Sequence, residues 1–166
     1  MLIAHYIGNH DKDDVLTRIG WAATRLVQRG RYSAVTHCEA IHRIGMNNLV
    51  TIASASLRDG GVRVKHNIQL TQGKWLIIDV PQFSVDLSIE WFAQHIGQPY
   101  DLRGALATVL PGTGLSDHWF CNETVAASVD FKDPQIFGPA QFASITASIG
   151  TDVTQEFFKG YIKNEL

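Results

Sequence analysis

Four strand-like segments separated by short turn sequences constrain the fold of this chain more than any other feature. The turns lie at residues 45–48, 59–61 and 72–73, and they combine Gly with Asn, Asp or Gln. Asp-Gly and Gly-Gly pairs supply the positive φ angles that tight hairpins require. The sequence therefore predicts an antiparallel meander of about four strands, over residues 31–44, 48–57, 61–70 and 74–81.

Helical periodicity flanks this region on both sides. Apolar residues recur at helical spacing over 13–28, and Gly30 is typical of a helix end. Further helices are predicted over Ser88–Ile96, Asp101–Leu110, Trp119–Val129, from Pro139 onward, and over Asp152–Ile162. Helices packed against a small antiparallel sheet define an α+β fold. Without any visible repeat or linker, residues 1–166 are expected to form a single domain.

Composition excludes several classes of protein. Hydrophobic residues make up 45% of the 166 residues and charged residues 18%, which is a normal balance for a globular protein. A net charge of −2 without basic clusters gives no reason to expect a nucleic-acid partner.

No apolar run has the length of a membrane helix, so no integral membrane contact is expected. The N-terminal sequence lacks signal-peptide features, so we expect cytoplasmic synthesis, with the final site of action and the oligomeric state left open.

The segment around Cys121 is the first candidate for chemistry. Ser116 or Asp117 is expected to cap a helix, which places Cys121 in its first turn. The positive end of a helix dipole lowers the pKa of a thiol, and free backbone N–H groups there can bind an oxyanion. The alternative is a buried structural cysteine, the commonest fate of a free cysteine in an apolar helix.

The segment SAVTHCEAIH supplies a candidate base. Strand alternation places His37 and Glu39 on one face and Cys38 on the opposite face, where it is expected to be a small core residue. His37 could take a proton from Cys121, or could be a hydrogen-bonded core residue. Glu39 could orient the imidazole or lie at the rim of a cleft. Its rivals for the orienting role are polar residues of the next strand: Ser54, Ser56 and Thr51.

These motifs together resemble the permuted branch of the NlpC-type, papain-like amidases, which includes YiiX-like proteins and lecithin:retinol acyltransferase-like enzymes. The His strand reads Thr36-His37-Cys38-Glu39, and the Cys motif reads Phe120-Cys121-Asn122-Glu123 followed by small apolar residues. Between them, residues 97–101 match the family's Gly-x-x-Tyr-Asp segment. Residues 54–63 are similar to phage and prophage members. Asn122 stands where the family usually has Ser, and a cysteine directly after the histidine is a further departure.

The resemblance implies a cysteine hydrolase of the amidase or peptidase type that needs no cofactor. It implies Cys121 as nucleophile, His37 as base and Glu39 as third catalytic residue. Amide bonds in cell-wall peptides are the leading expected substrate. The alternatives are a lipid amide or ester hydrolase or acyltransferase of the same fold, and a non-catalytic, phage-associated structural or binding protein.

Other polar residues carry weaker expectations. Asp59 and Gly60 are interpreted as a hairpin turn, and Arg63 as a residue that could contact substrate. Tyr100 and Asp101 could line a cleft or pack and cap a helix, and Glu123 is expected to make a structural hydrogen bond. A zinc site is the main alternative chemistry, but its possible ligands show no metal-binding spacing: His37, Cys38, His118 and Cys121.

Overall fold

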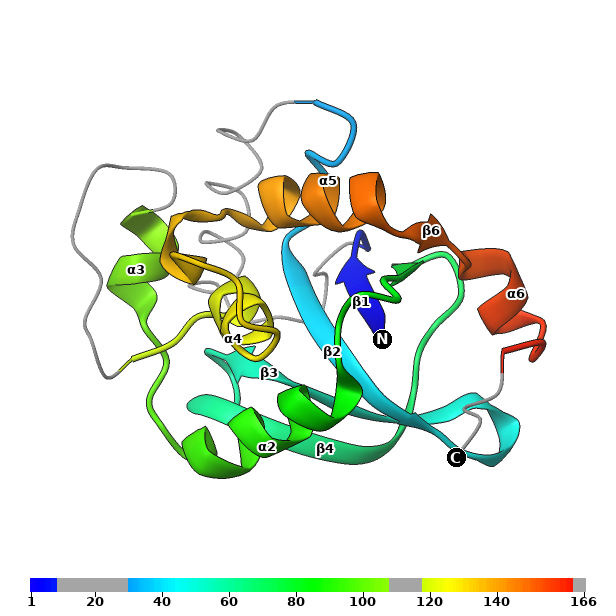
Figure 1. Ribbon diagram of the computed structural model, residues 1–166, viewed down its shortest axis with the longest axis horizontal. Coiled ribbons are helices and arrows are strands. Elements are labelled where there is room, and N and C mark those ends of the chain that lie inside the picture. The colour runs from blue at the N-terminus through cyan, green and yellow to red at the C-terminus, as the bar shows by residue number, and fades with distance from the viewer. Residues whose placement is uncertain (9–29, 108–117, 163–166) are drawn as a thin grey trace.

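The computed structural model describes residues 1–8, 30–107 and 118–162 and shows an α+β fold (Figure 1). The strands are β1 Leu2–Tyr6, β2 His37–Ile44, β3 Leu49–Ser56, β4 Gly61–Gln69, β5 Trp75–Asp79 and β6 Thr151–Asp152. The helices are α2 Val85–His95, α3 Leu102–Ala107, α4 Cys121–Ala127, α5 Pro139–Ile149 and α6 Thr154–Phe158, with short 3₁₀ turns at Met46–Asn48 and Pro134–Ile136. The helix predicted over 13–28 lies outside the described residues.

The sheet has the strand order β4-β3-β2-β1-β5-β6, and all its pairings are antiparallel. The consecutive hairpins β2-β3 and β3-β4 confirm three strands of the predicted meander. The predicted place of the fourth strand is wrong, because β5 pairs with β1 and not with β4. Strand β1 was not predicted, because Leu2, Ile3 and Ala4 are all buried and this central strand therefore lacks the alternation of a half-exposed strand.

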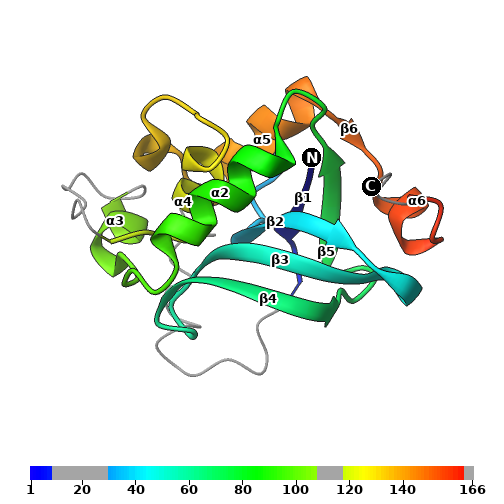
Figure 2. The same ribbon diagram turned by 60° about the horizontal axis from the view of Figure 1, so that its bottom comes forward.

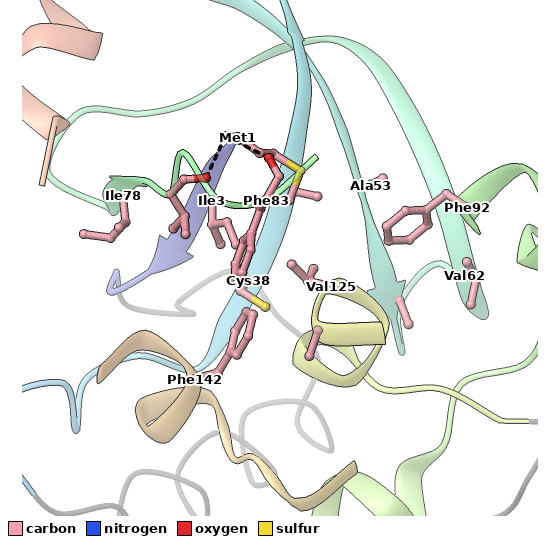
Figure 3. Close-up of a cluster of buried hydrophobic side chains, with 14 residues drawn as sticks. Met1, Ile3, Cys38, Ala53, Val62, Ile78, Phe83, Phe92, Val125 and Phe142 are labelled. Atoms are coloured by element: carbon pink, nitrogen blue, oxygen red, sulfur yellow. Dashed lines mark hydrogen bonds between the residues drawn. The ribbon is translucent and has the colours of Figure 1, made fainter. Parts of the chain in front are cut away.

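Two apolar clusters cover the two faces of the sheet. The larger one joins Cys38 and Ala40 of β2 to Val125 of α4, Phe92 of α2 and Phe142 of α5 (Figure 3). Figure 2 shows α2 and α4 on the same side of the β2-β3-β4 part of the sheet. The second cluster lies on the other face and includes Phe157 of α6. The start of β2 is therefore covered by α4, which brings the two segments singled out by the sequence together.

Most helix boundaries differ from the predicted ones by a few residues. Helix α2 begins earlier than predicted because Ser84 caps it, accepting a hydrogen bond from the Leu87 N–H at 3.3 Å. Helix α5 begins at Pro139 as predicted, since proline is preorganised for a first helical position. The observed helix α6 is shorter than the C-terminal helix predicted over Asp152–Ile162. It begins later because Thr151 and Asp152 pair with β5 as the edge strand β6.

In the described ranges, no helix combines the length and apolar character needed to cross a membrane.

A buried polar network connects β2, α2 and α4. The Nε2 atom of His42 lies 3.0 Å from Ser88 Oγ, and Ser88 Oγ lies 2.9 Å from Ser128 Oγ. Ser128 in turn donates to the Val125 carbonyl at 2.9 Å. Burial lowers the pKa of His42 from 6.5 to about 4, so the imidazole is neutral in the folded protein at neutral pH.

This network predicts an acid-sensitive step in stability. A histidine whose pKa is lowered by folding binds more protons when unfolded, so its contribution is present above pH 6.5 and is lost as the pH falls toward 4. The shift corresponds to about 3 kcal/mol at about 1.4 kcal/mol per pKa unit. Denaturant unfolding between pH 7 and pH 4 measures it. The variant His42→Gln keeps a polar group near Ser88 and should show a shallower fall, and an unchanged fall would contradict this assignment.

Candidate active site

Helix α4 begins at Cys121, and Phe120 is its N-cap residue. The prediction of a cap at Ser116 or Asp117 is therefore wrong, because the helix starts later. The Phe120 backbone N–H instead donates to the Glu123 carboxylate at 3.3 Å, which is the structural hydrogen bond expected for Glu123. Burial raises the pKa of Glu123 to about 7, with Asp101 and Cys121 adding to the effect.

The first turn of α4 is fastened to strand β3. The Cys121 carbonyl accepts hydrogen bonds from Ser54 Oγ at 3.3 Å and from Thr124 Oγ1 at 2.7 Å. Thr124 Oγ1 also accepts the backbone N–H of Ala55 at 3.2 Å. These bonds fix the helix start against the sheet, so the thiol of Cys121 has a defined place. The residue is 3% exposed.

His37 is the first residue of β2, and Glu39 contacts its ring directly. The distance from His37 Nε2 to Glu39 Oε1 is 2.7 Å, and the two side chains are 14% and 3% exposed. This bond occupies Nε2 and leaves Nδ1 as the ring nitrogen available to another partner. Glu39 therefore has the contact that an orienting residue requires.

The rival orienting residues make other contacts. Ser54 donates to the carbonyls of Ala55 and Cys121, both at 3.3 Å. Thr51 Oγ1 lies 3.2 Å from Nδ1 of His66. Of the polar side chains considered for this role, Glu39 is the one with a hydrogen bond to His37 in the described part of the chain.

Arg63 of β4 holds the carboxylate of Glu39 from the other side. Its Nη1 donates to Glu39 Oε2 at 2.7 Å, and its Nη2 donates to Oε1. Its Nε donates to Asp59 at 3.0 Å, and Lys65 binds the same Asp59 oxygen at 2.6 Å. Burial works to raise the pKa of Glu39, but the charges of Arg63 and His37 outweigh it and lower that pKa to about 2.

The contact between Arg63 and Glu39 was missed in the sequence, where Arg63 was considered for substrate contact. The residues lie on β4 and β2, with β3 between them, and Arg63 pairs with Ser54. Because a residue shares a sheet face with its cross-strand partner, a known register would have placed Arg63 near Glu39. The register between β2 and β3 shifts between Ile41 and Arg43, so the position of the turn at 45–48 does not by itself place Glu39 against β3.

Cys121 and His37 interact through a hydrogen bond between their side chains and through opposite charges. Burial works to lower the pKa of His37, but the charges of Glu39 and Cys121 raise it to about 9. Hydrogen bonding from Cys38 is the largest effect that lowers the pKa of Cys121, and His37 also lowers it against the opposing effect of burial. The site therefore favours a thiolate next to an imidazolium at neutral pH.

Cys38 contributes directly to this arrangement. It is fully buried in the cluster between the sheet and α4, as a small core residue would be. Hydrogen bonding from its thiol and from its backbone lowers the pKa of Cys121. Burial first, and then the neighbouring Cys121, raise the pKa of the Cys38 thiol well above its usual range. Cys38 and His37 were expected on opposite faces of the strand, yet both influence the pKa of Cys121 at the start of α4.

The neighbouring residues complete the surroundings of the thiol. Burial raises the pKa of Tyr100, and the charges of Cys121 and Asp101 act in the same direction. Asp101 accepts the Gly104 backbone N–H at 2.7 Å and so caps the start of α3. Asn122 donates to the Phe137 carbonyl, and its Oδ1 lies 3.5 Å from Cys121 Sγ, where it can accept from the protonated thiol.

The residues considered for zinc do not form a recognisable metal centre. Within residues 1–8, 30–107 and 118–162, no group of three or more His, Cys, Asp and Glu side chains is arranged to hold a metal ion. His118 has a buried Nδ1 atom with no hydrogen-bond partner and is not part of such a group.

No family model, curated protein or solved structure matches this chain significantly.

The contact between Arg63 and Glu39 predicts a large coupling in stability. Arg63→Met leaves the Glu39 charge buried without its main partner, and we expect a loss of about 3 kcal/mol in the free energy of unfolding. Adding Glu39→Gln removes the unpaired charge. The double variant should therefore lose less free energy of unfolding than the sum of the losses in the two single variants. Denaturant unfolding of the four proteins in this cycle measures the coupling. Additive effects would show that the two charges do not interact as described.

Proposed function

We propose that the protein is a thiol hydrolase of the permuted papain-like type, in which Cys121 is the nucleophile, His37 the base and Glu39 the orienting residue. The observation that carries the proposal is the chain of contacts from Cys121 to His37 and from His37 Nε2 to Glu39 at 2.7 Å. Nucleophile, base and a third group that orients the base are the common arrangement in covalent catalysis.

In this mechanism the proton of Cys121 rests on His37 before substrate arrives. The thiolate attacks the carbonyl carbon of an amide, and backbone N–H groups at the start of α4 support the developing oxyanion. His37 then gives its proton to the leaving amine, and an acyl-enzyme remains on Cys121. Water, deprotonated by His37, attacks the acyl-enzyme and releases the acid and the free thiol.

The order of the elements supports the permuted type, and the resemblance of the motifs supports the expected substrate. Strand β2, which carries His37, precedes helix α4, which carries Cys121, in the chain. Helix α4 packs on the face of the sheet that contains β2. The resemblance of the motifs around His37 and Cys121 to permuted NlpC-type amidases favours amide bonds in cell-wall peptides. Lipid amides and esters belong in the same substrate panel, since acyltransferase-like relatives of that branch share the order.

The test of the catalytic pair is the pH dependence of Cys121 alkylation. Iodoacetamide labelling, followed by peptide mapping, should show a thiolate that titrates well below the usual cysteine pKa of about 8.5. His37→Ala should return the titration toward that value, because the imidazolium that stabilises the thiolate is lost. The comparison is made in a Cys38→Ser background and repeated with Cys38 present, because Cys38 itself contacts the nucleophile. A normal titration in every variant would contradict a catalytic role.

The substrate assignment predicts a specific loss of activity. Soluble cell-wall peptides, simple acyl amides and lipid esters are incubated with the protein, and product is followed by mass spectrometry. We expect peptide amides to be cleaved with the highest kcat/KM, and Cys121→Ala to reduce that value by at least about a thousandfold. His42→Gln, which alters a buried histidine of β2 bonded to Ser88, serves as a control for general damage. Turnover that survives Cys121→Ala would overturn the assignment of the nucleophile.

A further inference from the structure

The two cysteines of the chain, far apart in sequence, meet at one place in the fold. Cys38 follows His37 on β2, and its sulfur points from the strand toward α4 and Phe142 (Figure 3). Val125 and Ala126 of α4 belong to the same buried cluster as Cys38, so this helix packs directly over the strand. Cys121 opens that helix and is 3% exposed. The first turn of the helix is bonded to Ser54 and Ala55 of β3, the strand next to β2, and Cys38 and Cys121 each shift the pKa of the other.

The two sulfur atoms are chemically unequal. Cys121 receives hydrogen bonds from Cys38 and the charge of His37, and it begins α4, all of which favour a thiolate. Cys38 is fully buried beside that thiolate, which keeps it protonated. A sulfenic acid formed on a low-pKa cysteine condenses with a neighbouring thiol to a disulfide.

We propose that Cys38 and Cys121 form a reversible intramolecular disulfide when the protein meets a peroxide. The Cys121 thiolate attacks one oxygen of hydrogen peroxide, the O–O bond breaks, and Cys121 becomes a sulfenic acid while hydroxide leaves. The Cys38 sulfur then attacks the Cys121 sulfur, the S–O bond breaks, and the Cys38 proton and the departing hydroxide form water. The peroxide is reduced, and the two thiols are oxidised together to one disulfide.

The fold favours this product over further oxidation. Cys38 lies in the core beneath α4 and Cys121 begins that helix, so the disulfide requires a local approach of the two sulfur atoms to about 2 Å. A sulfenic acid without a nearby thiol proceeds to sulfinic and sulfonic acids, which ordinary thiols do not reduce. Cys38 therefore protects Cys121 from irreversible oxidation. If Cys121 is the nucleophile proposed above, the disulfide also stops hydrolysis, and this consequence rests on the proposed function, whereas formation of the disulfide does not.

The experiment treats the purified full-length protein with hydrogen peroxide and maps its peptides without reduction. We expect a peptide pair joined through residues 38 and 121, a monomer on a non-reducing gel, and near-complete recovery of both free thiols after dithiothreitol. In Cys38→Ser, Cys121 should be trapped by dimedone as sulfenic acid, and the fraction that dithiothreitol cannot recover should rise several-fold. Cys38→Ala provides the same comparison without a polar atom in the core.

The outcomes separate this inference from the proposed function. Sulfinic or sulfonic acid on Cys121 in the wild type, with Cys38 remaining a free thiol, would overturn the inference. A disulfide between two molecules, or no oxidation of either residue, would overturn it as well. The proposed function is tested apart from this, by alkylation without oxidant, so a normal thiol pKa there refutes the hydrolase and leaves the peptide map to decide the disulfide.

Discussion

The buried carboxylate of Glu39 is the group on which the arrangement of the site depends. An isolated charge at 3% exposure would be costly, and the protein offsets this with two cationic partners, Arg63 from β4 and His37 from β2. The paired carboxylate fixes one edge of the imidazole and favours its charged form. The imidazolium in turn favours the thiolate of Cys121. The site is thus a series of alternating charges that begins at the exposed turn of Asp59 and ends at the helix start.

The sheet supplies the rigidity that this series requires. Strand β3 lies between the strands that carry Glu39 and Arg63, and its residues Ser54 and Ala55 bind the first turn of α4. Cys121 and His37 are therefore positioned by neighbouring strands of the same sheet. Cys38 is part of this unit, since it fills the core beneath α4 and also lowers the pKa of the Cys121 thiol. Cys38 therefore contributes to packing and also influences the pKa of Cys121.

Much of this arrangement could be predicted from local sequence, and the rest depended on long-range register. The hairpins β2-β3-β4 followed from their turn residues, and the α+β class followed from the periodicity changes along the chain. Cys121 at a helix start and His37 with Glu39 on one strand were visible as local patterns. The central strand β1 was missed because burial on both faces removes alternation. The partners of Glu39 and Cys38 were missed because they lie on elements whose relative placement no local pattern specifies.

The charge state of His37 tests the account most directly. Nuclear magnetic resonance titration of protein labelled in its histidine rings reports protonation of each imidazole separately. The account predicts that His37 remains an imidazolium through neutral pH and loses its proton near pH 9, and that Cys121→Ala lowers this pKa because a neighbouring negative charge is removed. A His37 that is neutral at pH 7 and titrates at or below 6.5, unaffected by Cys121→Ala, would contradict the thiolate–imidazolium pair.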